Sequence, residues 1–190
     1  MLHLPHPFAL RAMRLSDIDA VLAVDRLSFP TPARPSLFEH ELTDNPIASY
    51  QVLTLAGDEG EQVIGFAGFW LIADEVHVST IAVHPDWRGY GLGEALLLNL
   101  LLLAYAREEA ALATLEVRRS NLSAQALYRK YRFEVVGERR RYYRDTGEDA
   151  LIMTVASLDE AYWEFLQVQV PVVVARLSRF VANSFPKSQE

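Results

Sequence analysis

The sequence predicts a globular domain of mixed α/β class that is followed by a helical tail. Strand-like segments stand on both sides of a long apolar helical segment near the middle of the chain, which is the order of a mixed α/β fold. Apolar residues make up 51% of the 190 residues and charged residues 23%, a mix typical of a soluble folded protein. A chain of this length can bury a substantial core.

The first half of the chain predicts, in order, a strand at 8–13, a helix at 16–29, a helix at 37–42, and strands at 50–56 and 62–72. Ser16 is a favourable N-cap for the first helix, and Pro30 stops that helix. The two strand segments are rich in β-branched and aromatic residues. The turn signal between them, residues 57–60 (GDEG), predicts a hairpin.

The second half predicts a strand at 75–83, a helix at 91–110, a strand at 112–117, a helix at 123–130, and strands at 133–142 and 150–155. Period-two alternation indicates the first of these strands, and the turn 145–147 joins the last two. In the tail, apolar residues recur at helical spacing with a break at Pro171. We expect the tail to pack on its own domain or on a second copy in a homodimer, with a membrane-surface role as the less favoured alternative.

Composition excludes several classes of function. The chain has no cysteine, which excludes disulfides, thiolate metal sites and a cysteine nucleophile. Its net charge of −7 argues against nonspecific nucleic-acid binding, and its five histidines lack the spacing of a metal site. The N-terminus lacks a secretory signal pattern, and the apolar run 95–106 is too short to span a bilayer, so we expect a cytoplasmic protein without a metal or a membrane partner.

A glycine-rich loop connects the predicted strand 75–83 to the long helix. Residues 88–93 read RGYGLG, so that three glycines stand at alternate positions. Glycines let a backbone approach a ligand and turn several N–H groups toward it, and the helix N-terminus and Arg88 add positive charge. This pattern predicts a pyrophosphate site, although its spacing fits neither the P-loop nor the Rossmann fingerprint.

The loop resembles the acetyl-CoA loop of the GNAT acetyltransferase superfamily, whose pattern is Gln/Arg-x-x-Gly-x-Gly/Ala. Residues 115–128 (LEVRRSNLSAQALY), 140–143 (RRYY) and 148–153 (EDALIM) are similar to the RimI group of ribosomal-protein alanine acetyltransferases. The resemblance covers about residues 8–155. It implies the GNAT fold, a mixed and mostly antiparallel sheet flanked by helices, and leaves residues 156–190 as a C-terminal helical extension.

The resemblance implies direct acetyl transfer from acetyl-CoA to a protein N-terminal amine, with a ribosomal protein as the family precedent. An α-amine has a pKa of about 7.7–8.0 and must lose a proton before it attacks. Glu116 matches the family's general base and Tyr128 its general acid. The residues implied to bind acetyl-CoA are Ile81 and Val83 through their backbone, Arg88, Gly89, Tyr90, Gly91, Gly93 and Glu94 in the loop, and Asn121 on the pantetheine arm. Asn121 also suits a helix N-cap.

Tyr142 and Tyr143 match the family's peptide groove, and strand alternation predicts that one faces the groove while its neighbour points the other way. Without the resemblance, Glu116 would read as a solvent-facing carboxylate and the tyrosines as packing residues. Residues 29–36 (FPTPARPS) depart from the family's Pro-Trp-Ser step, which keeps a lysine or small-amine acceptor as an alternative. The long tail leaves a second alternative open: a non-catalytic protein that binds acetyl-CoA as a sensor or as an assembly module. Transfer to free but not to blocked peptide N-termini would separate the first alternative from the favoured reading.

Overall fold

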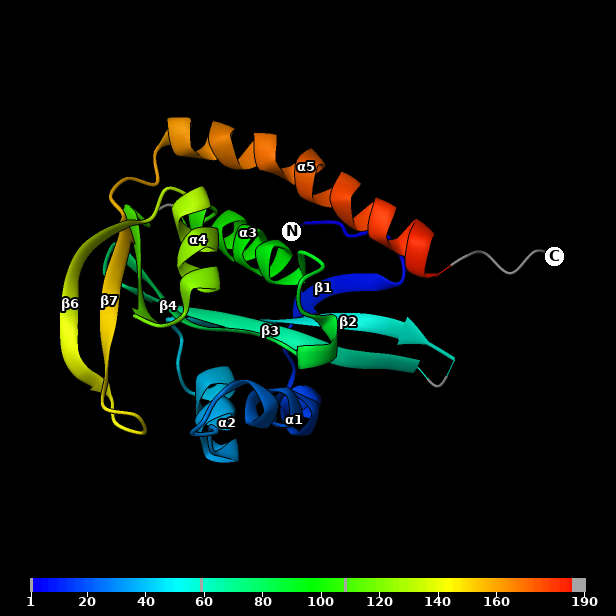
Figure 1. The fold of residues 1–190 in the computed structure, drawn as a ribbon, viewed down its shortest axis with the longest axis horizontal. Helices are drawn as coiled ribbons and strands as arrows, with labels where there is room; N and C mark the ends of the chain where they lie inside the picture. The colour runs from blue at the N-terminus through cyan, green and yellow to red at the C-terminus, as the bar shows by residue number, and fades with distance from the viewer. Residues whose placement is uncertain (1, 59, 108, 186–190) are drawn as a thin grey trace.

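Seven strands form one sheet in the computed structural model, which describes residues 2–58, 60–107 and 109–185 (Figure 1). The elements are β1 (Phe8–Ala12), α1 (Ile18–Ser28), α2 (Pro35–Thr43), β2 (Ala48–Gly57), β3 (Gly60–Ile72), β4 (Glu75–Val83), α3 (Leu92–Tyr105), β5 (Leu112–Arg118), α4 (Leu122–Lys130), β6 (Glu134–Tyr143), β7 (Glu148–Val155) and α5 (Glu160–Ser184). The strand order is β1-β2-β3-β4-β5-β7-β6, and only the β4–β5 pair is parallel. The predicted mixed, mostly antiparallel sheet is confirmed.

Helices cover both faces of the sheet, as Figure 1 shows. Helices α1 and α2 lie on one face over a small core that includes Val21, Leu22 and Phe66. Helices α3, α4 and α5 lie on the other face over a larger core. The sheet is therefore covered on both sides, which explains the long apolar run in β3.

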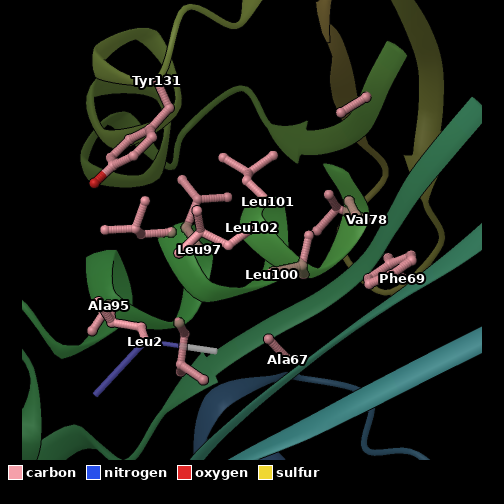
Figure 2. Packing of buried hydrophobic residues seen from close by; sticks show 14 of the residues in the cluster. Leu2, Ala67, Phe69, Val78, Ala95, Leu97, Leu100, Leu101, Leu102 and Tyr131 are labelled. Carbon is pink, nitrogen blue, oxygen red and sulfur yellow. The ribbon is translucent and has the colours of Figure 1, made fainter. Parts of the chain in front are cut away.

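Helix α3 is the centre of the larger core and is buried around most of its circumference (Figure 2). Asn99, in the middle of this helix, is fully buried and accepts a hydrogen bond from the Leu2 N–H at 2.6 Å. Asn99 also donates to Gln51, whose own amide donates to the Leu96 carbonyl at 2.9 Å. A buried amide is stable only when it is hydrogen-bonded. Asn99 therefore ties α3 to β2 and to the N-terminal segment.

Two predicted helix boundaries differ from the structure. Ser16 is not an N-cap, because a 3-10 turn (Leu15–Asp17) precedes α1. The Asp17 carboxylate instead accepts the Arg14 N–H at 2.7 Å, which closes that turn. The long helix ends at Tyr105 rather than at 110. The predicted turn residue 59, helix residue 108 and tail residues 186–190 lie outside the described residues.

The early end of α3 has a physical cause in the sheet. The Ala111 N–H donates to the Asp74 carbonyl at 2.8 Å, just before β5 begins. The chain must leave the helix several residues earlier in order to return to the start of β4. Strand pairing with a distant segment thus overrides the local helical pattern of residues 106–110.

The predicted break at Pro171 is wrong, because α5 runs without interruption from Glu160 to Ser184. Proline removes one backbone donor inside a helix, but Leu166 and Val173 on either side of it are fully buried against the domain. Tertiary packing holds the helix together across the proline. In the described part of the chain, α5 is the one helix long and apolar enough to cross a membrane, with a mean hydropathy of 1.3.

Candidate active site

A wedge opens between β4 and β5, the two parallel strands at the middle of the sheet. The strands pair only from Glu75–Leu112 to Val78–Leu115. Beyond that point Ser79 is an extra residue in β4, since Gly68 of β3 lies opposite Thr80 while Phe69 lies opposite Val78. A bulge bends its strand and interrupts pairing. The last residues of β4 and of β5 therefore diverge, and Glu116 is the first β5 residue past the paired region.

Backbone groups of Ile81 and Val83 face this wedge. In β4, Ala82 lies opposite Phe66 and the His84 N–H donates to the Ile64 carbonyl at 2.8 Å. Hydrogen bonding alternates along an antiparallel pair, so the intervening Ile81 and Val83 turn their amides and carbonyls away from β3. The strand edge that the resemblance assigned to pantetheine is thus open to a ligand.

The glycine loop follows β4 and ends at the N-terminus of α3. Gly89 and Gly91 have φ angles of 84° and 90°, which residues with a β-carbon rarely adopt. Gly91 is the residue that precedes the first helical turn, and its carbonyl accepts the Ala95 N–H. The first N–H groups of a helix have no partner inside it. Those of Leu92, Gly93 and Glu94 are therefore free for an anion.

The charged and aromatic side chains of the loop are held by other elements. Arg88 donates from Nε to the Val83 carbonyl at 2.8 Å and from Nη2 to Ser28 Oγ at 3.0 Å, which fixes the loop against α1. Tyr90 stacks on Phe180 of α5, with ring centroids 4.2 Å apart. The loop therefore presents its backbone, rather than flexible side chains, to the wedge.

Glu116 lies among residues from the β6–β7 hairpin. Its carboxylate forms an ion pair with Arg139 at 3.2 Å, and the Tyr143 hydroxyl donates to its carbonyl at 3.4 Å. Arg118, two residues further along β5, places its guanidinium 3.9 Å from the centre of the Tyr143 ring. The same guanidinium binds Asp145 in the hairpin turn at 2.6 Å. The hairpin is thus tied to the strand that carries Glu116.

Tyr142 and Tyr143 do not point to opposite sides, contrary to the prediction from strand alternation. Their rings meet at 90° with centroids 5.1 Å apart. The ladder shifts register between Arg139 and Tyr143, and Arg141 inside this bulge has a left-handed φ of 51°. A bulge changes the direction of the side chains that follow it. Both tyrosines therefore belong to the same surface beside Glu116.

Burial raises the pKa of the tyrosines around Glu116. The pKa of Tyr143 rises to about 12 because of burial and nearby anionic groups, although Arg118 opposes the change. The pKa of Tyr142 is raised by burial and by the Glu116 carboxylate, with Arg139 acting against it. Both hydroxyls stay protonated at neutral pH and can donate hydrogen bonds to an acceptor molecule.

Tyr128 lies on α4 and packs against the larger core. Its ring lies 5.9 Å from that of Phe133. Burial raises its pKa to about 12, with a smaller contribution from Tyr143. Asn121 sits at the start of the same helix, where its Oδ1 accepts from the Ala124 N–H at 3.1 Å. The Oδ1 atom of Asn121 therefore caps the N-terminus of α4. The amide nitrogen of Asn121 is the group that would bind a ligand.

Four charged residues near the predicted site were not predicted to take part in it: Arg118, Lys130, Arg139 and Arg176. Arg118 shares a strand face with Glu116, so strand alternation could have found it. Arg139 comes next to Glu116 only through the β5–β7–β6 pairing. No local pattern predicts that pairing. Arg176 reaches the loop from α5, 82 positions after Glu94.

A separate surface cavity of about 520 Å³ lies between α2, β2 and the end of α3, lined by residues that include Glu41, Asn45, Tyr50 and Arg107. Within the part of the chain that the structure describes, its lining contains none of the predicted site residues. The wedge, and not this cavity, brings the predicted residues together.

The chain is similar to known acetyltransferases. Residues 18–133 match the model of the Acetyltransferase (GNAT) family. A Bacillus subtilis protein named putative [ribosomal protein bS18]-alanine N-acetyltransferase is 42% identical over 147 residues, covering 77% of this chain and 94% of that protein. The N-alpha-acetyltransferase RimI of Mycobacterium tuberculosis is 36% identical over 146 residues, covering 75% and 84%.

Solved structures give the same result for the fold. The crystal structure of the ribosomal-protein-S18-alanine N-acetyltransferase from Escherichia coli superposes with a TM-score of 0.70 at 30% identity, covering 80% of this chain and 96% of that one. The family match includes β4, the glycine loop, α3, β5 and α4, the elements that form the wedge. The chain belongs to the GNAT acetyltransferase family and is an acetyl-CoA-dependent N-acetyltransferase.

Proposed function

We propose that this enzyme acetylates the α-amine of a protein N-terminus, with an N-terminal alanine of a ribosomal protein as the favoured acceptor. The observation that carries the proposal is the gathering of Glu116, Tyr142 and Tyr143 just past the point where β4 and β5 separate. Several relatives carry the name of ribosomal-protein alanine acetyltransferases, which supports the same acceptor.

The wedge and the loop fit acetyl-CoA, which supplies an activated acetyl thioester when bound. Gly89 and Gly91 hold the loop in a conformation that turns the free N–H groups of α3 toward a phosphate. The Ile81 backbone and the Val83 N–H offer partners to the pantetheine amides, whereas the Val83 carbonyl already accepts from Arg88. The Asn121 amide nitrogen can donate to the same arm. Arg88 keeps the loop against β4 and adds positive charge near the phosphates.

Glu116 acts as the general base of the reaction. An α-amine arrives mostly protonated at neutral pH, and its proton must leave before the nitrogen can attack the thioester. Arg139 holds the Glu116 carboxylate at 3.2 Å. An incoming ammonium competes with Arg139 for this carboxylate, which then takes the proton directly or through one water molecule.

Tyr128 acts as the general acid. Its phenol is protonated at neutral pH, and burial raises its pKa further, to about 12. Its hydroxyl gives that proton to the thiolate of CoA as the thioester breaks, and the tyrosinate recovers a proton from the attacking nitrogen, which loses one as the amide forms. Transfer is direct from thioester to amine, since the chain has no cysteine that could carry the acetyl group.

Tyr142 and Tyr143 bind the backbone of the acceptor peptide from the hairpin side. Their protonated hydroxyls and their shared position beside Glu116 suit an extended chain end. We take residues 8–155 as the catalytic unit, residues 156–190 as its extension, and the cytoplasm as its compartment. A homodimer through the extension stays a prediction.

The test is acetyl transfer to short peptides with free N-termini, measured for the wild type and for the Glu116→Gln and Tyr128→Phe variants. Each variant should lose about 10²- to 10⁴-fold in kcat, the usual contribution of a general acid or base. Binding of acetyl-CoA should stay intact, since neither side chain is assigned to hold it. Glu134→Gln, an exposed glutamate on β6, is the matched control and should keep full activity.

The acceptor panel separates the alternatives. Transfer to an alanine-starting peptide but not to its N-terminally blocked form supports the proposal. Transfer to blocked peptides through lysine, or only to polyamines, would replace the proposed acceptor. Binding of acetyl-CoA without transfer to any amine would favour a sensor.

A further inference from the structure

The last turns of α5 and Phe185, the residue that follows it, contact the segment between β4 and α3 at several points. Phe180 stacks on Tyr90, and the Phe185 ring lies parallel to that of Trp87 at 6.3 Å. Arg176 packs its guanidinium directly against Gly91. Helix α5 lies beyond the residues that match the family model, and it runs on the same side of the sheet as α3 (Figure 1). It therefore contacts the loop from outside the wedge.

The contact at Gly91 is very close. A β-carbon at this glycine would lie 2.7–2.9 Å from the guanidinium atoms of Arg176, which is shorter than real contacts allow. Arg176 Nη2 donates to Glu94 at 2.7 Å. Its Nε is buried and has no hydrogen-bond partner among the described residues. The arginine thus gives up one hydrogen bond to sit at the N-terminus of α3.

Glu94 explains why a cation is needed at this place. Its carboxylate lies in the first turn of α3, next to the N–H groups that would hold a phosphate. Lys130 of α4 binds the same carboxylate at 2.5 Å, and the Tyr131 hydroxyl donates to it at 3.0 Å. One carboxylate and two cations give a local charge of −1 + 1 + 1 = +1. Without Arg176 the sum would be zero.

We propose that Arg176 is a positioning residue for acetyl-CoA, which acts through Glu94 to keep the α3 N-terminus net positive and the glycine loop in its binding conformation. The proposal rests on the placement of the acetyl-CoA phosphates at this loop. Anions bind helix N-termini through free N–H groups and the helix dipole, and a neighbouring uncompensated carboxylate opposes them. The C-terminal extension therefore completes the acetyl-CoA site of this enzyme.

Point variants of Arg176 can test this without undocking α5. Four other residues of the helix, Tyr162, Leu166, Val173 and Leu177, are buried against the domain. Arg179, one turn further along, is exposed and bonds only a carbonyl of its own helix in the described structure. Arg179→Gln therefore removes the same charge from the same helix and is the matched control.

The experiment measures the dissociation constant of CoA by calorimetry and the steady-state constants for acetyl-CoA and peptide. Arg176→Gln should weaken CoA binding about three- to tenfold, the range of charge effects at helix termini. The KM for acetyl-CoA should rise by the same factor, while kcat and the peptide KM stay unchanged. Arg176→Lys should recover most of the affinity, and Arg179→Gln should bind like the wild type.

A double variant tests whether Arg176 acts through Glu94. In the double variant Glu94→Gln/Arg176→Gln, Lys130 is the one charged group of these three that remains, so the local charge returns to +1. This double variant also leaves no buried carboxylate short of a partner, so it keeps the measurement possible if the single variant is unstable. CoA affinity within about twofold of the wild type supports the proposal. An affinity as weak as that of Arg176→Gln, or weaker, overturns it.

A loop variant separates this inference from the proposed site. Gly89→Asp adds a carboxylate to the loop at a position where a β-carbon meets no atom within 4 Å and where aspartate tolerates the positive φ. It should weaken CoA binding more than Arg176→Gln does. If Gly89→Asp binds CoA weakly while Arg176→Gln binds it as the wild type does, only the proposed role of Arg176 fails. If Gly89→Asp binds CoA normally, the placement at this loop fails, and the role of Arg176 fails with it.

Discussion

At the scale of single residues, the surroundings of Glu116 depend on one backbone irregularity in β6. Arg141 has a left-handed φ of 51°, and its N–H donates to the Asp149 carboxylate at 2.8 Å. This conformation costs free energy for any residue with a β-carbon and persists where its surroundings require it. Here it turns Tyr142 and Tyr143 to the same side. The bulge is the feature that places both tyrosines beside Glu116.

Substitutions at Arg141 should reveal this dependence. Arg141→Gly should keep activity and match or exceed the wild-type stability, because glycine adopts positive φ without strain. Arg141→Val should lower the free energy of unfolding by about 1–3 kcal/mol. It should also raise the KM for the peptide without changing the KM for acetyl-CoA. Urea unfolding and steady-state kinetics measure both effects.

The control for this prediction is Arg140→Val, since Arg140 is highly exposed and is not among the residues with positive φ. Valine suits a strand at that position. Equal stability and equal peptide KM for the valine variants at 140 and 141 would show that the bulge does not orient the tyrosines.

At the scale of elements, α5 shows how tertiary packing overrides local sequence. The apolar spacing of the tail predicts a helix, and Pro171 predicts its interruption. The helix continues because its buried side chains lie on both sides of the proline and dock on α3 as one surface. The proline still destabilises the helix, and the packing of α5 on the domain offsets that loss of stability.

Replacing this proline should therefore stabilise the protein. Pro171 is exposed and sits inside a 25-residue helix. Pro171→Ala restores one backbone donor and should raise the free energy of unfolding by about 1–3 kcal/mol, as measured by urea unfolding. Pro35→Ala is the control, because proline at the first position of α2 is favourable and its loss should give no gain. A stability loss in Pro171→Ala would mean that the proline itself is needed.

At the scale of the whole molecule, buried tyrosines join the extension to the domain. Tyr162 of α5 donates from its hydroxyl to the Tyr131 carbonyl at 2.9 Å, and Tyr131 donates to Glu94. Burial is the main cause that raises the pKa of both tyrosines above the usual value of 10. The same network that docks α5 thus depends on protonated phenols.

The protein should lose stability in alkaline solution through these groups. Above pH 10 the unfolded chain releases phenolic protons that the folded state retains, so the unfolded state binds fewer protons and the free energy of unfolding falls as pH rises. Urea unfolding should show constant stability up to about pH 9 and a steady fall above about pH 10. In Tyr162→Phe this fall should be shallower. An identical pH slope in the variant would assign the effect to other groups.

The residues of the candidate site could be named from the sequence because they lie in short contiguous runs. The glycine loop with Gly89 and Gly91, and the run that contains Glu116 and Tyr128, each occupy one strand–loop–helix segment. Their chemistry depends on residue type and local spacing, which a sequence displays directly. The shared orientation of Tyr142 and Tyr143 could not be predicted, because it depends on a bulge that has no sequence signal here.

The sequence by itself determined the mixed α/β class, nearly all strands and helices, and the family, because periodicity and motifs are local properties of the chain. Only the tertiary structure decided that α3 ends at Tyr105, that α5 passes through Pro171, and that Arg176 meets Glu94 across 82 positions. These outcomes arise from strand pairing and packing between distant segments. Their free energies exceed the local preferences of the residues involved, and no short stretch of sequence records them.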